Sequence, residues 1–558
     1  MLTPEQLARL PASVVELWQQ VEEDTLADMC RRISKMDGVT DTAAWQAWRL
    51  EQTRLFRRDL TKRLAQMLGR SETEVRKLLS DAGTQTLAAD DAIYKLVGKN
   101  PLPPNESPAL SNLLNAGARQ TQGSFVNITA TTANTATGQF ERTLDRAWLQ
   151  TSSGAFDYKT AVRQAVSDLA DKGLEAIEYP SGHTDTLEVA VRRAVLTGVN
   201  QTAGKLQTAH MNEMGCEFVE VTAHAGARPS HAEWQGKVYH RGGAVQVDGT
   251  FYPDFETATG YGTGEGLCGW NCRHNFYPYY PEISERVYSD ERLAELDARN
   301  IEYGGKMYTR YEINQMQRAM ERRVRKCKRQ FVCEDAAGLD TTQSAVKLKN
   351  AREQLKNFAY ETGGRVDSAR TSTHEFGRVA AGKATWTSEH YHKEWLKSIG
   401  AQNSELNTLA KYYEGKYNNS PAYQLLKQYS SDVKSGWISP NATLENYLKQ
   451  YDRIQSEIVG QTTAGGTVVT GQRAHFMQRV LGTAVDPKKY AEDHRIIRRS
   501  GVEIDAIKDA LLSPEKVDPP VTRADGKRSV RYIGKDCLVT VNPDTGELIQ
   551  TNPRRKKK

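Results

Sequence analysis

Cysteines and histidines near the middle of the sequence carry the side chains that bind transition metals. Three residues separate Cys268 from Cys272, and His274 follows two positions later. His231 lies upstream, preceded by His224. Thiolate and imidazole are the ligands that tetrahedral zinc prefers, and the short Cys-Cys spacing suits one ion, although the complete set matches no standard zinc finger. We predict a zinc site formed by Cys268, Cys272, His274 and His231.

The same segment has a second interpretation. The thiols and imidazoles could fill a small, loop-rich core in which the glycines at 260, 262, 264 and 266 allow tight turns. This glycine run has neither the Gly-Lys-Ser/Thr of a phosphate loop nor the Gly-x-Gly-x-x-Gly of a dinucleotide site. We therefore expect no nucleotide there, and the sequence leaves zinc and simple packing open.

A strongly basic stretch covers residues 310–329 and includes Arg322, Arg323, Arg325 and Lys326. A basic helix can contact nucleic-acid phosphates without reading bases. A solvated helix face is the alternative. A second basic run begins with Arg554 and Arg555 and could make the same kind of contact.

The elements that position these residues begin with helices. Thr3 to Gln6 combine a capping threonine, a proline and a glutamine in the order that starts a helix, and residues 71–74 repeat this pattern before an expected stop at Gly83. Apolar residues such as Val14 and Trp18 recur at helical spacing. The resulting one-sided helices could pack together in a bundle or dock onto another subunit.

Further along, residues 101–104 and the Thr/Asn/Ala-rich run 129–137 predict loop or linker. A capped long helix is expected from residue 187 to about Gly215, a strand over 217–222, and a polar helical region over about 340–460.

The last predicted unit is small, basic and of α+β type. A capping box at 500–503 starts a helix, and strands at 529–533, 537–542 and 547–551 follow, joined by turns. Residues 473–558 contain 19 lysines and arginines against 12 acidic residues, so this unit carries a net charge of +7. Strand alternation places Thr540 and Asn542 on one face, with Arg531 able to lie across from them.

The expected fold class is multidomain and mainly α, with a small Cys/His-containing α+β module and a C-terminal α+β domain made of a helix and a three-stranded antiparallel meander. The expected parts are an N-terminal helical region (1–118), a core with the Cys/His module (119–290), a basic helix (291–335), a helical connector (336–470) and the basic C-terminal domain (471–558).

Composition limits the class of protein. A chain of 558 residues is too long to fold around a single hydrophobic core. Its mean hydropathy of −0.64 indicates that many helices are exposed or covered only by partner subunits. No stretch approaches the roughly 20 apolar residues of a membrane span, and the first residues lack a signal-peptide pattern. Seven cysteines without a regular framework indicate a reducing compartment.

Two stretches together carry a specific resemblance. Ala227-Arg-Pro-Ser-His231 and Leu267-Cys-Gly-Trp-Asn-Cys-Arg-His274 resemble the minor capsid protein 2 family of tailed phages, which is related to portal-adjacent head morphogenesis proteins. The helical N-terminal region is similar to that family as well, so the likeness covers roughly the first 330 residues. It implies a virion protein present in a few copies, made in the host cytoplasm, with portal and major capsid proteins as partners and packaged DNA or RNA bound by charge.

The C-terminal unit resembles small nuclease-like domains of the barnase, EndoU, colicin and RelE type. The likeness rests on His475 to Arg479, on residues 498–502, on Arg531-Tyr532 and on the strand ending at Asn542. It implies His475, Arg479, Arg531 and Thr540 as catalytic residues, since RNA cleavage needs a base, an acid and cations at the phosphorane. A nucleic-acid-binding or structural relic of such a domain is the alternative.

The reading that unites these observations is a minor head protein of a tailed phage, structural and near the portal, assisting head assembly, DNA packaging or ejection. A rival is a toxin-type effector whose C-terminal domain is an RNA-cleaving nuclease delivered with the virion. A DNA-packaging accessory that binds through the basic helix and tail is the third possibility.

Overall fold

The computed structural model describes residues 2–36, 41–102, 106–484, 498–522 and 526–554. The chain divides into two units, Met1–Thr385 and Trp386–Lys558, and each is described by itself. Within the described residues, no helix is long and apolar enough to cross a membrane. All seven cysteines are buried and free.

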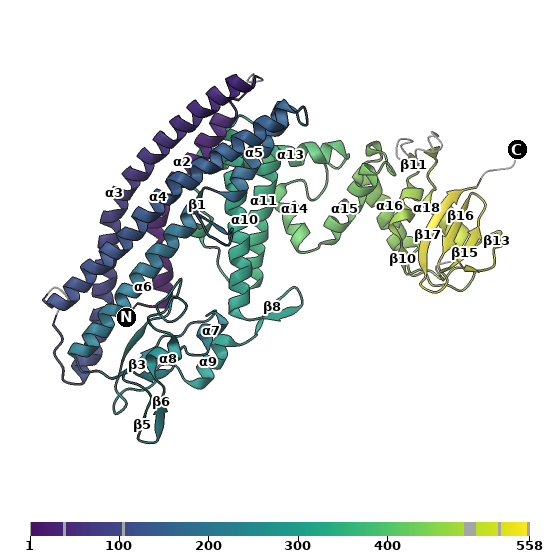
Figure 1. Ribbon diagram of the computed structural model, residues 1–558. Helices are drawn as coiled ribbons and strands as arrows, with labels where there is room; N and C mark the ends of the chain where they lie inside the picture. Colours follow the sequence, from purple (N-terminus) through teal and green to yellow (C-terminus); the bar gives the residue numbers. More distant parts are fainter. Residues whose placement is uncertain (1, 37–40, 103–105, 485–497, 523–525, 555–558) are drawn as a thin grey trace. The chain divides into compact units, whose positions relative to one another are not determined.

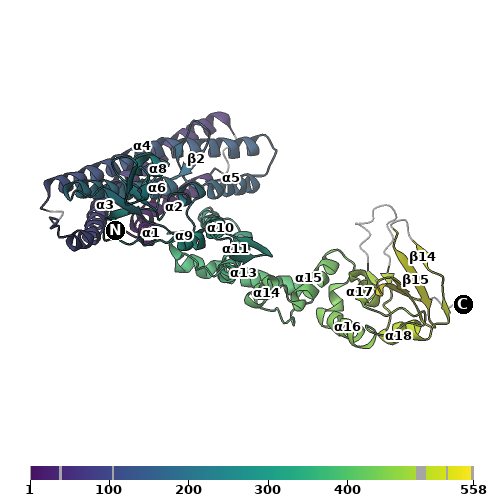
Figure 2. The same ribbon diagram turned by 90° about the horizontal axis from the view of Figure 1, so that it is seen from below.

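Long helices dominate the first unit, and α3 and α4 run side by side along it in both ribbon views (Figures 1 and 2). The 55 residues of α3 give it a length of about 80 Å. These helices are α1 (Pro4–Arg9), α2 (Ala12–Ile33), α3 (Thr42–Leu96), α4 (Pro108–Ser152), α5 (Tyr158–Lys172) and α6 (Leu187–Glu213). A short hairpin of β1 (Glu175–Glu178) and β2 (Thr184–Thr186) precedes α6.

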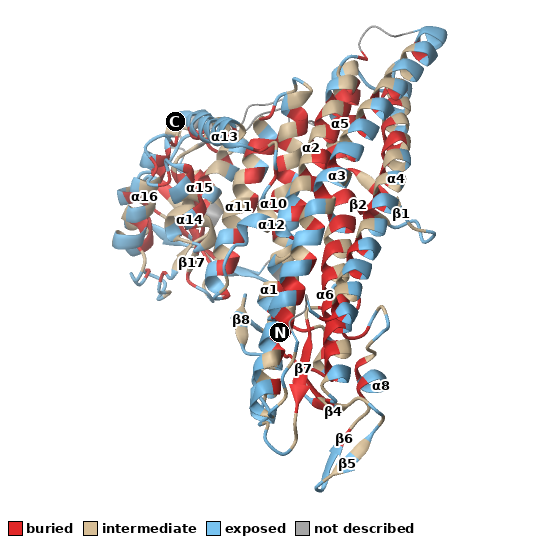
Figure 3. Cartoon of the chain, turned by 90° about the vertical axis from the view of Figure 1, so that its left-hand side faces the viewer, coloured by how far each residue is buried: buried red, intermediate tan, exposed pale blue. Residues whose placement is uncertain are grey.

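The apolar helix faces predicted from the sequence pack on one another. Trp18 of α2 stacks on Phe125 of α4 with ring centroids 5.6 Å apart, and Phe56 of α3 meets Phe140 of α4 at 4.6 Å. Figure 3 shows buried residues along the helix faces of this bundle and exposed residues on the outside. Of the two possibilities that the sequence left open, packing within the chain is the one observed for these faces.

Small residues let α4 and α6 approach closely. A Cβ added to Gly117 of α4 would overlap the Thr202 side chain of α6, and one added to Gly198 of α6 would overlap the Thr121 side chain of α4. The contact is therefore reciprocal, and glycine is required at both positions because the space is already filled.

A helix start, a helix end and a linker predicted from the sequence are wrong. Helix α3 continues through Ser71, whose hydroxyl donates to the Leu68 carbonyl, and through Gly83, where a Cβ would lie 2.8 Å from Leu114. Gly83 therefore serves packing and ends no helix. Residues 129–137, expected as linker, lie inside α4, where threonine hydroxyls bond the carbonyl four residues earlier and satisfy their polarity inside the helix.

The predicted Cys/His module follows α6 and is built on a three-stranded antiparallel sheet of order β4-β3-β7. Its strand β3 (Phe218–Val221) confirms the strand expected there. The remaining elements are α7 (Pro229–Ala232), β4 (Val238–His240), β5 (Val245–Val247), β6 (Thr250–Tyr252), α8 (Phe255–Thr259), β7 (Phe276–Tyr279) and α9 (Asp290–Asp297).

The basic helix forms as predicted and returns along the bundle as α10 (Arg310–Ala336), beginning with a complete capping box at Thr309. A hairpin of β8 (Ile301–Tyr303) and β9 (Lys306–Tyr308) leads into it. Helices α11 (Thr342–Glu361), α12 (Ser368–Thr371) and α13 (Arg378–Ser398) follow.

The second unit combines a helical half with a sheet. Its described helices are α14 (Leu409–Tyr417), α15 (Pro421–Lys434), η1 (Pro440–Ala442), α16 (Leu444–Glu457), α17 (Ala474–Val480) and α18 (Ile504–Leu512). Short strands β11 (Thr483–Ala484) and β12 (Arg498–Arg499) pair with each other. Helix α18 begins after Glu503 without a side-chain cap, so the helix is confirmed but its predicted capping box is wrong.

The predicted meander is confirmed as β15 (Arg528–Ile533), β16 (Cys537–Val541) and β17 (Glu547–Pro553), paired antiparallel in sequence order. The sheet is larger than expected, because β10 (Gly471–Gln472) pairs parallel to β17, while β13 (Lys516–Val517) and β14 (Val521–Thr522) pair with β15. One hydrophobic core joins Tyr429 and Tyr447 of the helical half to Val539 of the sheet.

Candidate metal centre

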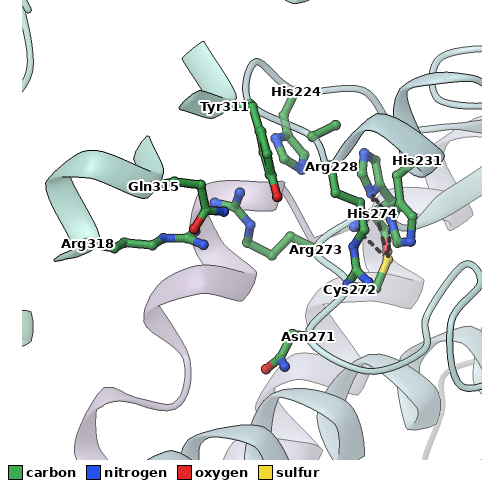
Figure 4. Close-up of a pocket in the computed structure, with 12 residues that line it drawn as sticks. His224, Arg228, His231, Asn271, Cys272, Arg273, His274, Tyr311, Gln315 and Arg318 are labelled. Carbon is green, nitrogen blue, oxygen red and sulfur yellow. Dashed lines mark hydrogen bonds between the residues drawn. The ribbon is translucent and has the colours of Figure 1, made fainter. Parts of the chain in front are cut away.

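Three side chains of the module face one another at short distances. The Nδ1 atoms of His231 and His274 are 3.4 Å apart, and the Sγ of Cys272 lies 3.8 Å from the first and 3.7 Å from the second. Figure 4 shows the Cys272 sulfur pointing toward the two imidazole rings. These residues form the group with metal-binding geometry in the described part of the chain.

The spacing of these atoms fits one ion. Zinc held tetrahedrally at about 2.05 Å from nitrogen and about 2.3 Å from sulfur separates two nitrogens by about 3.3 Å and nitrogen from sulfur by about 3.6 Å. The observed separations of 3.4, 3.8 and 3.7 Å are within 0.2 Å of that triangle. The donor set could therefore hold zinc with little rearrangement.

Hydrogen bonds select the tautomer of each histidine. The Nε2 of His231 lies 2.9 Å from the Glu265 carbonyl, and the Nε2 of His274 lies 3.1 Å from Oε1 of Gln235. Both partners accept, since Gln235 Oε1 also receives the backbone N–H of His224. Each Nε2 must then carry the hydrogen, which leaves both Nδ1 lone pairs directed at the shared space. Two facing lone pairs repel unless a cation lies between them.

Burial sets the charge of the group. It lowers the pKa of His231 to about 4 and the pKa of His274 well below its ordinary value, so both rings are neutral at neutral pH and available as ligands. It also raises the pKa of the Cys272 thiol, so a bound cation would have to displace the thiol proton.

Of the four predicted ligands, Cys268 lies outside the group. It is buried beside Gly204 of α6, where its Sγ would lie 3.2 Å from an added Cβ. The left-handed backbone of Cys268, with φ of 60°, contributes to the tight loop between α8 and β7. His224 stacks on the His274 ring at 4.5 Å and its Nδ1 bonds the Ala225 carbonyl.

Helix α6 positions the ligand loop. The side-chain amide of Asn200, fully buried, donates to the carbonyls of Cys272 and His274 at 3.1 and 3.2 Å. On the other side the three ligands line a cavity of about 310 Å³, together with Arg228 and Arg273 (Figure 4). Asn200 therefore holds the ligand loop from one side, and the cavity gives access to the ligands from the other.

The predicted basic contacts on α10 are only partly available to a ligand. Arg325 is ion-paired with Glu188 of α6, and Lys326 lies 3.0 Å from Asp171 of α5. Arg323 is exposed and donates to Gln354 of α11, and Arg322 is exposed. Half of the basic run thus fastens α10 to the bundle.

The predicted catalytic residues of the second unit lie in pairs on different elements. His475 and Arg479 share α17, where the His475 Nδ1 contacts Gln478 at 2.8 Å and Nε2 accepts from Arg479 at 3.2 Å. Arg531 of β15 lies directly opposite Thr540 of β16, as strand alternation predicted.

The two predicted tail residues differ in what the structure shows of them. Arg554 donates to the Gly534 carbonyl at 2.9 Å and pairs with Glu515, whereas Arg555 lies outside the described residues.

Sequence reasoning missed the residues that support the ligands. Gln235 is four positions after His231, a spacing that brings side chains together on one helical turn and could have indicated it. Asn200 and the arginines around the cavity come from distant segments, so no local signal marks them.

Comparisons with known proteins indicate the family of this chain. A family model described as phage minor capsid protein 2 matches residues 2–359. A structural protein of Lactococcus phage LL-H is 27% identical over 309 residues, covering 53% of this chain and 76% of that protein. A structural protein of Lactococcus phage mv4 is 37% identical over 113 residues, covering 20% of this chain and 81% of that protein. No solved structure matches.

Proposed function

We propose, since the chain belongs to the phage minor capsid protein 2 family, that its first unit attaches it to the portal and major capsid proteins of the head. The protein is a structural component of the phage virion. The observation that supports the assignment of attachment to the first unit is the extent of the family match, residues 2–359, which ends before the unit boundary after Thr385.

Particle incorporation tests this proposal. Heads assembled with a chain ending at Thr385 in place of the full chain should contain it at the full-chain level, measured by mass spectrometry of purified particles. A chain of residues 386–558 alone should be absent. Incorporation of the second unit without the first would contradict the proposal.

The His231, Cys272 and His274 group would bind zinc as an internal cross-link. The ion would join the turn at α7 to the loop before β7, and a water molecule from the cavity would complete four ligands. Support comes from the ligand triangle and from the two tautomers that direct Nδ1 inward. A structural ion of this kind would stabilise the loops at the edge of the module, beside the hydrophobic core that its strands and α8 form.

A second candidate function concerns the second unit. The cross-strand pair of Arg531 and Thr540 favours an RNA-cleaving domain, because it places a cation beside a hydroxyl on one sheet face. Both ring nitrogens of His475 are engaged within α17, so general-base catalysis by this residue requires that Arg479 first release Nε2. This function would make the chain an effector delivered with the virion.

A further inference from the structure

A small cavity in the first unit is lined mainly by arginines. It lies among α6, the ligand loop, α10 and α12, and its volume is about 180 Å³. Its charged lining residues are Arg192, Arg193, Arg318, Arg322, Arg325, Arg370, Glu188 and Glu321. Six positive and two negative side chains give a net charge of +4 in a space smaller than ordinary ligand pockets.

Ion pairs account for only part of this charge. Arg325 pairs with Glu188, which also lies 3.8 Å from Arg192. Arg193 pairs with Asp185, and Arg370 lies 3.1 Å from Asp367. These contacts consume the acidic groups nearest to the cavity.

The second buried acid compensates the remaining arginines only in part, because Glu321 attracts Arg318 without lying within ion-pair distance of it among the described residues. The buried Glu321 accepts from Gln317 at 2.9 Å. Among the described residues, neither Arg318 nor Arg322 forms an ion pair within 4.0 Å.

The excess charge continues into the cavity beside the metal ligands. Arg318 and Asn271 line both cavities. The cavity beside the metal ligands is also lined by Arg228 and Arg273 and has no carboxylate in its lining. In Figure 4 the side chains of Arg318 and Arg273 point toward the same part of the pocket from α10 and from the ligand loop. Four separate segments of the chain therefore direct guanidinium groups at one region.

This arrangement costs free energy when no anion is bound. Burial, together with repulsion from Arg370 and Arg273, lowers the pKa of Arg318 to about 10. Burial also lowers the pKa of Arg192. All these groups stay protonated at neutral pH, so the shifts record partly desolvated like charges that an anion would stabilise.

We propose that the arginine cavity binds a phosphate group, with Arg318, Arg192 and Arg370 as its main ligands. The planar guanidinium fork donates two parallel hydrogen bonds to such an oxyanion, and a multiply charged anion matches the uncompensated charge. The volume admits a phosphate, and a lining made mainly of guanidinium groups recognises its charge and not the identity of a base. The phosphate could be free inorganic phosphate or part of a nucleic-acid backbone.

Thermal unfolding of the full chain tests the proposal. Inorganic phosphate should raise the unfolding temperature above that in chloride of equal ionic strength, on the order of 3 °C at a hundredfold excess over Kd. Arg318→Gln should abolish this rise while unfolding, without phosphate, at the same or a higher temperature, because it relieves repulsion. Arg119→Gln, which removes an exposed positive charge on α4, should keep the full rise.

Two results would overturn the proposal. One is the absence of any rise specific to phosphate, and the other is an equal rise in Arg318→Gln and Arg119→Gln. If Arg318→Gln fails to fold, Arg192→Gln provides the same comparison.

A single-stranded oligonucleotide then identifies the source of the phosphate. Its binding is followed by fluorescence anisotropy. Weaker binding in Arg318→Gln, together with displacement of the oligonucleotide by inorganic phosphate at constant ionic strength, assigns the site to nucleic acid. Unchanged oligonucleotide binding alongside a lost phosphate response assigns it to the free anion.

Discussion

The orientation and tautomer of the two histidines in the candidate metal centre are set by the groups to which their Nε2 atoms donate. A backbone carbonyl takes the Nε2 hydrogen of His231 and an amide oxygen takes that of His274, so both rings turn Nδ1 inward. Neutral imidazoles that already have the correct tautomer lose little entropy on binding a cation. The groups that orient the candidate ligands would themselves not contact a bound ion.

The cysteine pair gives a sharp test of the zinc site. The purified chain should contain about one equivalent of zinc. Cys272→Ser should lose it, because Cys272 supplies the only thiolate of the triangle among the described residues, whereas Cys268→Ser should retain it, because Cys268 faces Gly204. Metal analysis of both variants, with unfolding temperature as a check on folding, decides the question. Metal loss in Cys268→Ser would restore the four-ligand interpretation.

The catalytic hypothesis for the second unit rests on one histidine. If the chain cleaves RNA, His475→Ala should lower turnover by a factor on the order of 100 or more with affinity nearly unchanged, as for loss of a general acid or base. Arg531→Ala should weaken both. Cleavage of bulk tRNA and its binding are the two measurements. Full turnover in His475→Ala removes this residue from the mechanism.

The sequence predicted the candidate site in part. Cys272, His274 and His231 belong to types and spacings that zinc uses, and the structure brings them together. Whether a cysteine four positions away points at the same centre depends on loop conformation, and at Cys268 the left-handed backbone turns the thiol toward α6. Such a local conformation has no signature in residue type.

At the scale of elements, the long helices and the strands with alternating patterns were predicted better than the helix caps. The capping boxes expected at residues 71–74 and 500–503 do not form, and α6 has no side-chain cap at Thr186. α6, α10 and the strands β15 to β17 form where expected. The errors at Ser71, Gly83 and residues 129–137 have a common cause. Residues that favour turns in isolation are accommodated inside long helices when small side chains and internal hydroxyl bonds serve the contact with a neighbouring helix.

The reciprocal contact of α4 and α6 should be sensitive to one methyl group. Gly198→Ala would push against the Thr121 side chain and should lower the free energy of unfolding by about 1–3 kcal/mol. Gly123→Ala on α4 is the matched control, since its Cβ would meet nothing within 4 Å and alanine favours the helix by about 1 kcal/mol. Denaturant unfolding of both variants measures the difference. Equal stability would mean that the two helices can separate at no cost.

A buried carboxyl on α2 makes stability depend on pH. Burial raises the pKa of Glu23 to about 8, against the hydrogen bond that it accepts from the Glu375 backbone at 2.7 Å. A raised folded-state pKa contributes stability below the ordinary value of 4.5, and this contribution is lost as pH rises through 8.

Glu23→Gln should remove that dependence. It should match the parent chain at pH 5 and exceed it at pH 9 by on the order of 3 kcal/mol, because an amide keeps the acceptor without the charge. Unfolding temperatures from pH 5 to 9 give the comparison. If the unfolding temperatures of Glu23→Gln and of the parent chain differ by the same amount at every pH in this range, groups other than Glu23 cause the pH dependence.

At the scale of the whole molecule, charge separates the two units. The +7 carried by residues 473–558 predicts salt-dependent nucleic-acid binding, since each phosphate contact releases counterions. The full chain should bind bulk tRNA more tightly than the chain ending at Thr385. The logarithm of its binding constant should also fall more steeply with the logarithm of the salt concentration. Titrations at 50 to 200 mM salt measure both slopes. Equal slopes would remove the second unit from nucleic-acid binding.

The division of the chain was harder to predict than its elements. Turn and charge signals placed a boundary near residue 470, yet Tyr429 and Val539 share a core. Cores form from residues distant in sequence, and neither turn residues nor a change in charge reports which apolar faces meet.

The position of β17 in its sheet bears on how the second unit is made. Residues 547–548 lie between β16 and a strand at 471–472, about 75 residues earlier, so the sheet stays open while the ribosome adds that segment. At 5–20 residues per second the wait is about 4–15 s, far longer than helix formation. The helical half that carries Tyr429 and Tyr447 shares one core with this sheet, so that core is incomplete during the wait. A nascent chain paused before residue 547 should therefore expose this half to proteases and chaperones while the first unit is already protected.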